Sequence, residues 1–197
     1  MHKREQTALE RPGFLSKDGL TAAEMGTALH AFLEHADFAA LAAAKASGTL
    51  DDAICAERDR QVAVQLTPPE IAEKLDVRRI RRFAESDAFA RICAADAVLR
   101  ELAFITALPA SAVLAAQGSA APEGEAAKAS VLVQGIADIV LIFPDHLELL
   151  DYKTDRRKTK ADFLAAYRAQ LNLYALAIDK RFAPKKTKYT CRIRECL

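Results

Sequence analysis

Apolar residues recur at helical spacing through the first half of the chain and alternate with polar residues in the second half. Thr21-Ala-Ala-Glu24 is a capping-box pattern, which predicts a helix beginning at Thr21. The same periodicity predicts further helices over residues 38–47, 51–65, 76–83 and 87–95, with a turn at Thr67-Pro68-Pro69. The first half therefore reads as a helical lobe.

Strand character begins near residue 98. Alternation predicts strands over about 98–108, 130–143 and 146–153, then a long helix over about 160–182 and a last strand over 187–196. Residues 115–129 are small and of low complexity, so we expect them to form a loop connecting two strands of a hairpin. A meander of three strands, a helix and one further strand is an α/β arrangement.

Composition places the chain among globular proteins with one substantial core. It has 197 residues, of which 51% are hydrophobic. No apolar run is long enough to cross a bilayer and the N-terminus lacks an apolar signal region, so we expect no membrane association and a cytoplasmic location. No phosphate-binding Gly-x-x-x-x-Gly-Lys-Ser/Thr loop occurs, which predicts that this chain has no ATP site.

The net charge of +1 hides an uneven distribution. Residues 151–197 carry 13 of the 28 Lys and Arg but only 5 of the 27 Asp and Glu. A basic segment of this kind can neutralise phosphates on DNA, although Lys and Arg also favour helix C-termini for structural reasons. Both interpretations stay open for each basic residue.

Two carboxylates stand at the ends of neighbouring apolar runs. Asp138 closes Gly135-Ile-Ala-Asp138, and Asp151 shares one face of the next predicted strand with Lys153. Two carboxylates can hold a hard cation such as Mg²⁺, which lowers the pKa of a bound water, while a lysine steadies the developing oxyanion. The pattern thus indicates metal-assisted phosphodiester hydrolysis. The structural alternatives are a turn-capping role for Asp138 and an ordinary ion pair between Asp151 and Lys153.

Two further patterns lie on predicted helices. Gly26 and His30 are one turn apart, so they share a face on which a small residue admits a phosphate or another backbone. Tyr167, Gln170 and Tyr174 form a stripe on the long helix, and their polar tips suit a nucleic-acid backbone. An isolated helical histidine is more often an ordinary residue, and a tyrosine at this spacing is more often core.

In order along the chain, the motifs Gly-x-x-x-His, Gly-x-x-Asp, Asp-Tyr-Lys-Thr and Gln-x-x-x-Tyr resemble the signature of RecB-type nucleases in the PD-(D/E)xK superfamily. The surrounding segments resemble the nuclease domain of AddA-type helicase–nucleases from about residue 10 to the end. This resemblance implies a restriction-endonuclease-like core over about 98–197 and a helical lobe over about 10–97. It also implies a single domain, 1–197, excised from a longer helicase–nuclease.

The resemblance assigns roles to individual residues. It implies that His30, Asp138, Asp151 and the backbone carbonyl of Tyr152 are metal ligands, and that Lys153 is catalytic together with both aspartates. Substrate contacts are implied for Gln170, Tyr174 and Gly26. Glu101, in Arg100-Glu-Leu-Ala-Phe104, matches an Arg-Glu-x-x-Phe element of the family without a definite role.

The implied activity is Mg²⁺-dependent hydrolysis of DNA, with Mn²⁺ as a substitute, in double-strand-break repair and recombination. The implied partners are single-stranded DNA delivered by a helicase, the helicase domains of the parent chain and an AddB-like second subunit. Some relatives hold an iron–sulfur cluster, but Cys55, Cys93, Cys191 and Cys196 lack the spacing for one. The alternatives are a stand-alone RecB-like or CRISPR-adaptation-type exonuclease and a catalytically silent module that binds DNA ends.

Overall fold

The protein is described by a computed structural model that covers residues 21–120, 122–152, 160–182 and 191–196. Its first half is a lobe of helices, as the periodicity predicts. The helices are α1 (Ala22–His35), α2 (Phe38–Ser47), α3 (Leu50–Ala63), α4 (Pro69–Ala72), α5 (Val77–Glu85) and α6 (Asp87–Ala94). Thr21 caps α1 with the predicted capping box, in which Thr21 and Glu24 bond each other's backbone N–H groups.

The second half is built on a four-stranded sheet in the order β1-β2-β3-β4. The strands are β1 (Ala97–Pro109), β2 (Ser130–Ile142), β3 (Leu147–Tyr152) and β4 (Cys191–Cys196). The first three strands are an antiparallel meander, and β4 runs parallel to β3. A parallel neighbour needs a crossover connection, and α8 (Lys160–Phe182) lies within it. The predicted α/β restriction-endonuclease-like order is confirmed.

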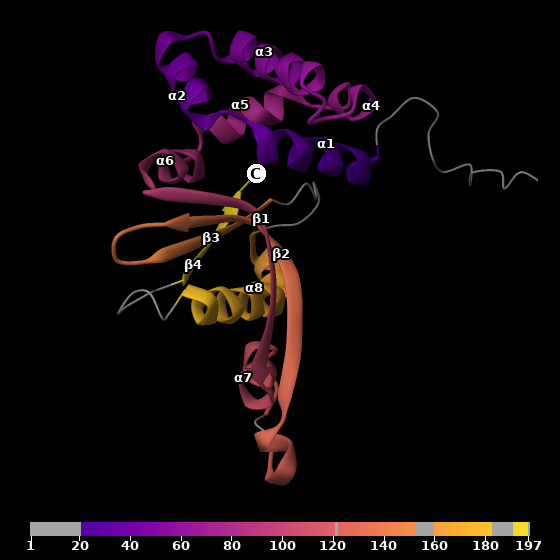
Figure 1. Ribbon diagram of the computed structural model, residues 1–197, viewed down its shortest axis with the longest axis vertical. Helices are drawn as coiled ribbons and strands as arrows, with labels where there is room; N and C mark the ends of the chain where they lie inside the picture. Colours follow the sequence, from indigo (N-terminus) through magenta and orange to yellow (C-terminus); the bar gives the residue numbers. More distant parts are fainter. Residues whose placement is uncertain (1–20, 121, 153–159, 183–190, 197) are drawn as a thin grey trace, which may run out of the picture.

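The lobe and α8 lie on opposite faces of the sheet (Figure 1). Toward the lobe, Ile139 and Leu150 pack with Phe83 and other lobe residues in one buried cluster. Toward α8, Val140 and Leu149 belong to a second buried cluster. The sheet therefore has two covered faces, which accounts for the burial of every residue of β3.

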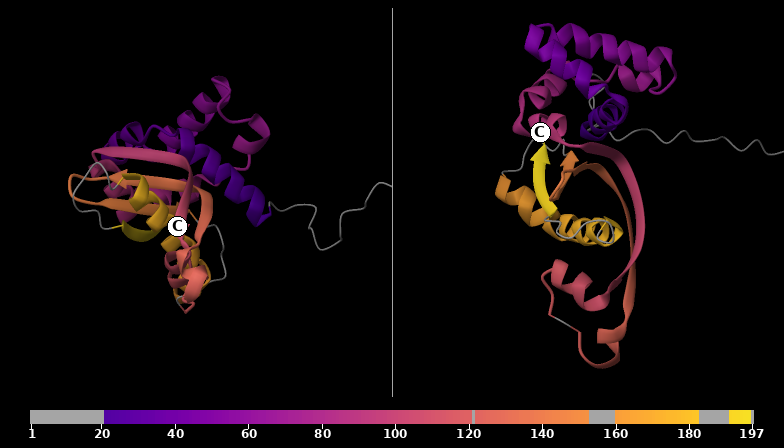
Figure 2. Two further views of the ribbon diagram at one scale, coloured as in Figure 1. Left: turned by 60° about the horizontal axis from the view of Figure 1, so that its bottom comes forward. Right: turned by 60° about the vertical axis from the view of Figure 1, so that its left-hand side comes forward.

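The β1–β2 hairpin extends beyond the rest of the sheet as a long curved ribbon that wraps around α8 (Figure 2). The connection between these strands holds α7 (Ala110–Ala116) and a short 3₁₀ helix (Gly124–Lys128). Residues 115–129 connect two strands of a hairpin, as expected, but the end of α7 extends into this range and the 3₁₀ helix lies within it. Ala-rich sequence forms helix readily once Val113 has an apolar surface to cover, and Val113 is 8% exposed.

Two other boundaries differ from those expected from sequence. The predicted turn at Thr67-Pro68-Pro69 leads directly into α4, because Pro69 occupies the first helical position where a missing N–H costs nothing. The predicted last strand is confirmed over β4, whereas residues 187–190 lie outside the described part of the chain. Among the described helices, none is long and apolar enough to cross a membrane.

Candidate metal centre

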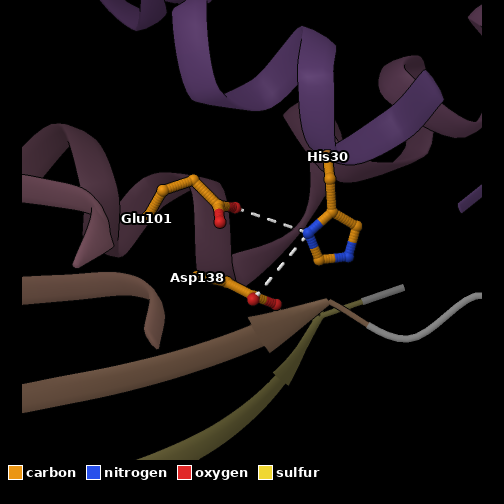
Figure 3. Close-up of side chains that lie close together, drawn as sticks. All are labelled: His30, Glu101 and Asp138. Carbon is orange, nitrogen blue, oxygen red and sulfur yellow. Dashed lines mark hydrogen bonds and ion pairs between the residues drawn. The ribbon is translucent and has the colours of Figure 1, made fainter. Parts of the chain in front are cut away.

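His30 projects from α1 toward two carboxylates on the sheet, Glu101 of β1 and Asp138 of β2 (Figure 3). Its Nδ1 atom lies 3.5 Å from Oε1 of Glu101 and 3.8 Å from Oδ1 of Asp138. The three donor atoms that these residues offer all lie within 4.8 Å of one another. The group thus joins the helical lobe to the sheet, and His30 and Glu101 are 71 positions apart in the sequence.

Glu101 has a left-handed backbone, with φ of 44°. Such a conformation is strained for a residue with a side chain, by about 1–3 kcal/mol. It coincides with a break in the ladder between β1 and β2, where Arg100 pairs with Ile139 and Leu102 pairs with Ala137 but the intervening pair is missing. Strained backbone of this kind concentrates at functional sites.

The left-handed residue also changes which side of β1 each side chain faces. Leu99 and Leu102 both pack against the cluster on the α8 side of the sheet, although a regular strand would place them on opposite faces. Arg100 and Glu101 consequently both face the helical lobe: Arg100 lies over Phe38, and Glu101 lies beside His30.

The facing segment of β2 is irregular in the same way. Ala137 and Val140 share the cluster on the α8 side, whereas Ile139 belongs to the cluster on the lobe side and Asp138 lies beside His30. The matched irregularities direct both carboxylates to the same side of the sheet, so that they meet the histidine from α1.

Asp138 is held by the neighbouring strand. Its Oδ2 atom accepts a hydrogen bond of 2.6 Å from the backbone N–H of Tyr152, just beyond the last pair of the β2–β3 ladder, Ile139 with Leu150. Its Oδ1 atom is the one that lies toward His30. One oxygen therefore fixes the orientation of the carboxylate while the other is directed at the centre.

The centre is open enough to admit a ligand. The side chains of His30, Glu101 and Asp138 are 33%, 28% and 11% exposed. Tyr152 forms the buried wall: its ring meets His30 edge to face at a centroid distance of 5.6 Å, and meets Phe83 at the same distance. The imidazole is therefore oriented by packing as well as by the helix that carries it.

The chemistry of this donor set fits a divalent cation. Glu101 and Asp138 bring like charges together, and a cation relieves their repulsion. Carboxylates suit Mg²⁺ and Mn²⁺, while an imidazole favours the transition metal of the two. Without a metal, His30 would form only two ion pairs, one with each carboxylate. Such ion pairs give no chemical role to three donor atoms that lie so close together.

Asp151 does not belong to the three-residue group. It is buried, 9% exposed, at the end of β3, and alternation places it with Leu147 and Leu149 rather than with Tyr152. Its predicted role as a ligand stays a prediction. Lys153, the predicted catalytic lysine, lies outside the described residues.

The predicted substrate-binding residues lie on two helices. Gly26 is in α1 one turn before His30, and Gln170 and Tyr174 are in α8, all three partly buried. The Tyr174 ring meets Phe104 edge to face at 4.9 Å and packs over the backbone of Gly135. This contact links the Gln-x-x-x-Tyr and Gly-x-x-Asp motifs, and substrate binding by the three residues stays a prediction.

Glu101 is the site residue to which the sequence assigned no role. The sequence signal was its place in Arg-Glu-x-x-Phe, but a glutamate in an alternating strand carries no sign of a left-handed backbone. The contact with His30 depends on that local geometry, which becomes visible only in the folded chain.

An antiparallel meander of three strands with a fourth strand parallel to β3 is the core of a PD-(D/E)XK nuclease. The histidine–carboxylate group at the irregular part of the β1–β2 hairpin fits the same class. The comparison with known families agrees, because residues 3–195 match the PD-(D/E)XK nuclease superfamily. The chain belongs to this superfamily, whose members use divalent metals.

The chain is also homologous to AddA proteins, which are named as subunits of an ATP-dependent helicase/nuclease. It is 36% identical over 178 residues to the protein from Heliobacterium modesticaldum and 37% identical over 180 residues to that from Moorella thermoacetica. The protein from Bacillus mycoides is 35% identical over 179 residues. These matches cover 86%, 90% and 86% of this chain but only 12–13% of the relatives, so the chain spans about an eighth of their length.

Proposed function

We propose that the protein is a divalent-metal-dependent deoxyribonuclease that hydrolyses phosphodiester bonds. The observation that carries the proposal is the convergence of His30, Glu101 and Asp138, from a helix and two strands, with donor atoms within 4.8 Å of one another. Membership of a nuclease superfamily over nearly the whole chain supports the same reaction.

In this proposal His30, Glu101 and Asp138 hold the cation, Mg²⁺ in the cell with Mn²⁺ as a substitute. When bound, the cation supplies a water of lowered pKa and neutralises charge that develops on the phosphate. The chain itself orients the donors: the N–H of Tyr152 fixes one oxygen of Asp138, and the Tyr152 ring supports the imidazole. Asp151 and the Tyr152 carbonyl are proposed as additional ligands from the family resemblance.

Cleavage of labelled single- and double-stranded DNA in Mg²⁺ or Mn²⁺ tests the proposal. Asp138→Asn keeps an oxygen that can accept from Tyr152 but removes the charge, so we expect at least a hundredfold loss of cleavage. Asp87→Asn is the matched control, because it makes the same change at an exposed position of α6. No metal-dependent cleavage by the wild type, with DNA binding intact, would instead support a silent module that binds DNA ends.

Lys153 has a separate role in the proposal. Its ammonium group is expected to act on the attacking water or the developing oxyanion rather than on the cation. Lys153→Ala should therefore lose most turnover and retain Mn²⁺ binding, whereas Asp151→Ala should lose both. Calorimetric titration of Mn²⁺ into the two variants separates these roles, and loss of binding in Lys153→Ala would contradict this division.

The relatives carry the name of a helicase/nuclease, and we propose that this chain supplies the nuclease activity beside an ATP-dependent motor during break repair and recombination. A helicase would deliver single strands to the centre, and an AddB-like subunit would be the second partner. Joining the chain to the motor part of a relative tests this: wild-type fusion should degrade unwound DNA in the presence of ATP, and the Asp138→Asn fusion should only unwind it.

A further inference from the structure

The side chain of Arg100, a residue of β1, lies at the C-terminal end of α1, the helix that carries His30. Its Nη1 atom lies 2.7 Å from the carbonyl oxygen of Ala36, 3.0 Å from that of Glu34 and 3.4 Å from that of Leu33. A helix leaves its last carbonyls without partners inside the helix. The C-cap residue, Ala36, is extended and does not form the left-handed turn that often satisfies these groups. Arg100 supplies the missing donor from β1.

The guanidinium group of Arg100 is fixed in place on its other side. It lies 4.0 Å from the centroid of the Phe38 ring, at the start of α2. Burial lowers the pKa of Arg100, but an arginine starts so high that it stays charged at neutral pH. A positive charge at a helix C-terminus is favourable because it meets the negative end of the helix dipole.

Other side chains hold the same helix end to the lobe and not to the sheet. Gln61 of α3 donates to the carbonyl of Phe32, and Arg60 donates to that of His35. Arg100 differs from these two because it comes from β1 and precedes Glu101 directly. The left-handed backbone at Glu101 places both side chains on the lobe side, one on the helix end and the other on the histidine.

We propose that Arg100 is a positioning residue, which holds the His30 helix at the separation from β1 that lets the imidazole and both carboxylates share one cation. The proposal rests on the metal centre put forward above. It follows from the geometry because the centre is divided between two parts of the fold. His30 lies on α1, whereas Glu101 and Asp138 lie on the sheet, so a loosened helix end would separate the donors without removing any of them.

Arg91 provides a matched control. It is also an arginine stacked over a phenylalanine, with its guanidinium carbon 4.2 Å from the Phe143 centroid, and it also joins the lobe to the sheet, through Glu148 of β3. It contributes no group to the α1 end or to the metal centre. Loss of the Arg91 side chain should destabilise the fold, but it should leave the relative positions of the donor atoms of His30, Glu101 and Asp138 unchanged.

The test is Mn²⁺ affinity, measured by electron paramagnetic resonance and calorimetry on the 197-residue chain at a temperature where each variant is folded by circular dichroism. Arg100→Ala should weaken binding at least tenfold and broaden the bound Mn²⁺ signal. Arg100→Lys, which keeps a charged donor, should recover part of the affinity and also covers the case in which the alanine variant does not fold. Arg91→Ala, or Arg91→Lys, should bind as the wild type does.

The outcomes separate this inference from the proposed function. Wild-type protein that binds no Mn²⁺ overturns the metal centre and the role of Arg100 with it. Wild-type binding together with unchanged affinity in folded Arg100→Ala overturns the role of Arg100 alone, and unchanged affinity in Arg100→Lys does so where the alanine variant does not fold. Equal weakening by the Arg91 variants also overturns it, because the effect would then follow general stability.

Discussion

Tyr174 packs directly over Gly135: a Cβ atom added to that glycine would lie 2.7 Å from the Tyr174 hydroxyl and 2.9 Å from Cζ of Phe104. Neither neighbour can withdraw easily, because the two rings are packed edge to face. The contact holds α8 against the hairpin three residues before Asp138. The glycine of the Gly-x-x-Asp motif therefore has a steric role, in addition to the role of the Asp138 carboxylate.

Gly135→Ala should therefore destabilise the protein by about 1–3 kcal/mol, the range for overpacking a well-filled site. The effect should depend on the ring above it, so that the same substitution should cost less in a Tyr174→Ala background. Urea unfolding of the four proteins of this cycle measures the coupling. Additive effects would show that the steric contact is not the cause.

Glu101 should respond differently to glycine and alanine. Both substitutions remove the carboxylate and should weaken Mn²⁺ binding, but only glycine accepts a φ of 44° without strain. We expect Glu101→Gly to be more stable than Glu101→Ala by about 1 kcal/mol. Thr106, on the same strand with an ordinary backbone, is the control: there alanine should be the more stable of the two. The same order at both positions would argue against strain at Glu101.

Much of the architecture follows from periodicity, since the helices of the lobe other than α4, the three-stranded meander and α8 all come from patterns that secondary structure imposes directly on sequence. His30 and Asp138 were also expected at one centre, through the resemblance to a family. Glu101 was not assigned, because its position depends on one left-handed residue that breaks the alternation of β1. The helix α7 was missed because its stability comes from tertiary packing, which an Ala-rich sequence does not reveal.

His30 should determine which metal the centre prefers. An imidazole nitrogen suits Mn²⁺ better than Mg²⁺, whereas carboxylates serve both. His30→Ala should thus weaken Mn²⁺ binding about tenfold or more and Mg²⁺ binding less, which reduces the preference for Mn²⁺. Competition of Mg²⁺ against bound Mn²⁺ measures the ratio. His35→Ala, in the last turn of the same helix, is the control, and an equal loss for both metals would exclude a direct contact by His30.

Glu24 should make the stability of α1 depend on pH at the acidic end. Hydrogen bonds from the Thr21 backbone and from Lys74 lower the pKa of Glu24 to about 2, from an ordinary value of 4.5. The folded state therefore favours the charged form, and the resulting stability is present above pH 4.5 and is lost as the pH falls toward 2.

At neutral pH, Glu24→Gln should lower the melting temperature. The difference from wild type should shrink between pH 4.5 and 2, and it should vanish below that range. Thermal melts at these pH values measure it, with Glu73→Gln, an exposed glutamate of the lobe, as the correction for losing one charge. A difference that stays constant down to pH 2 would show that the capping box does not depend on the carboxylate charge.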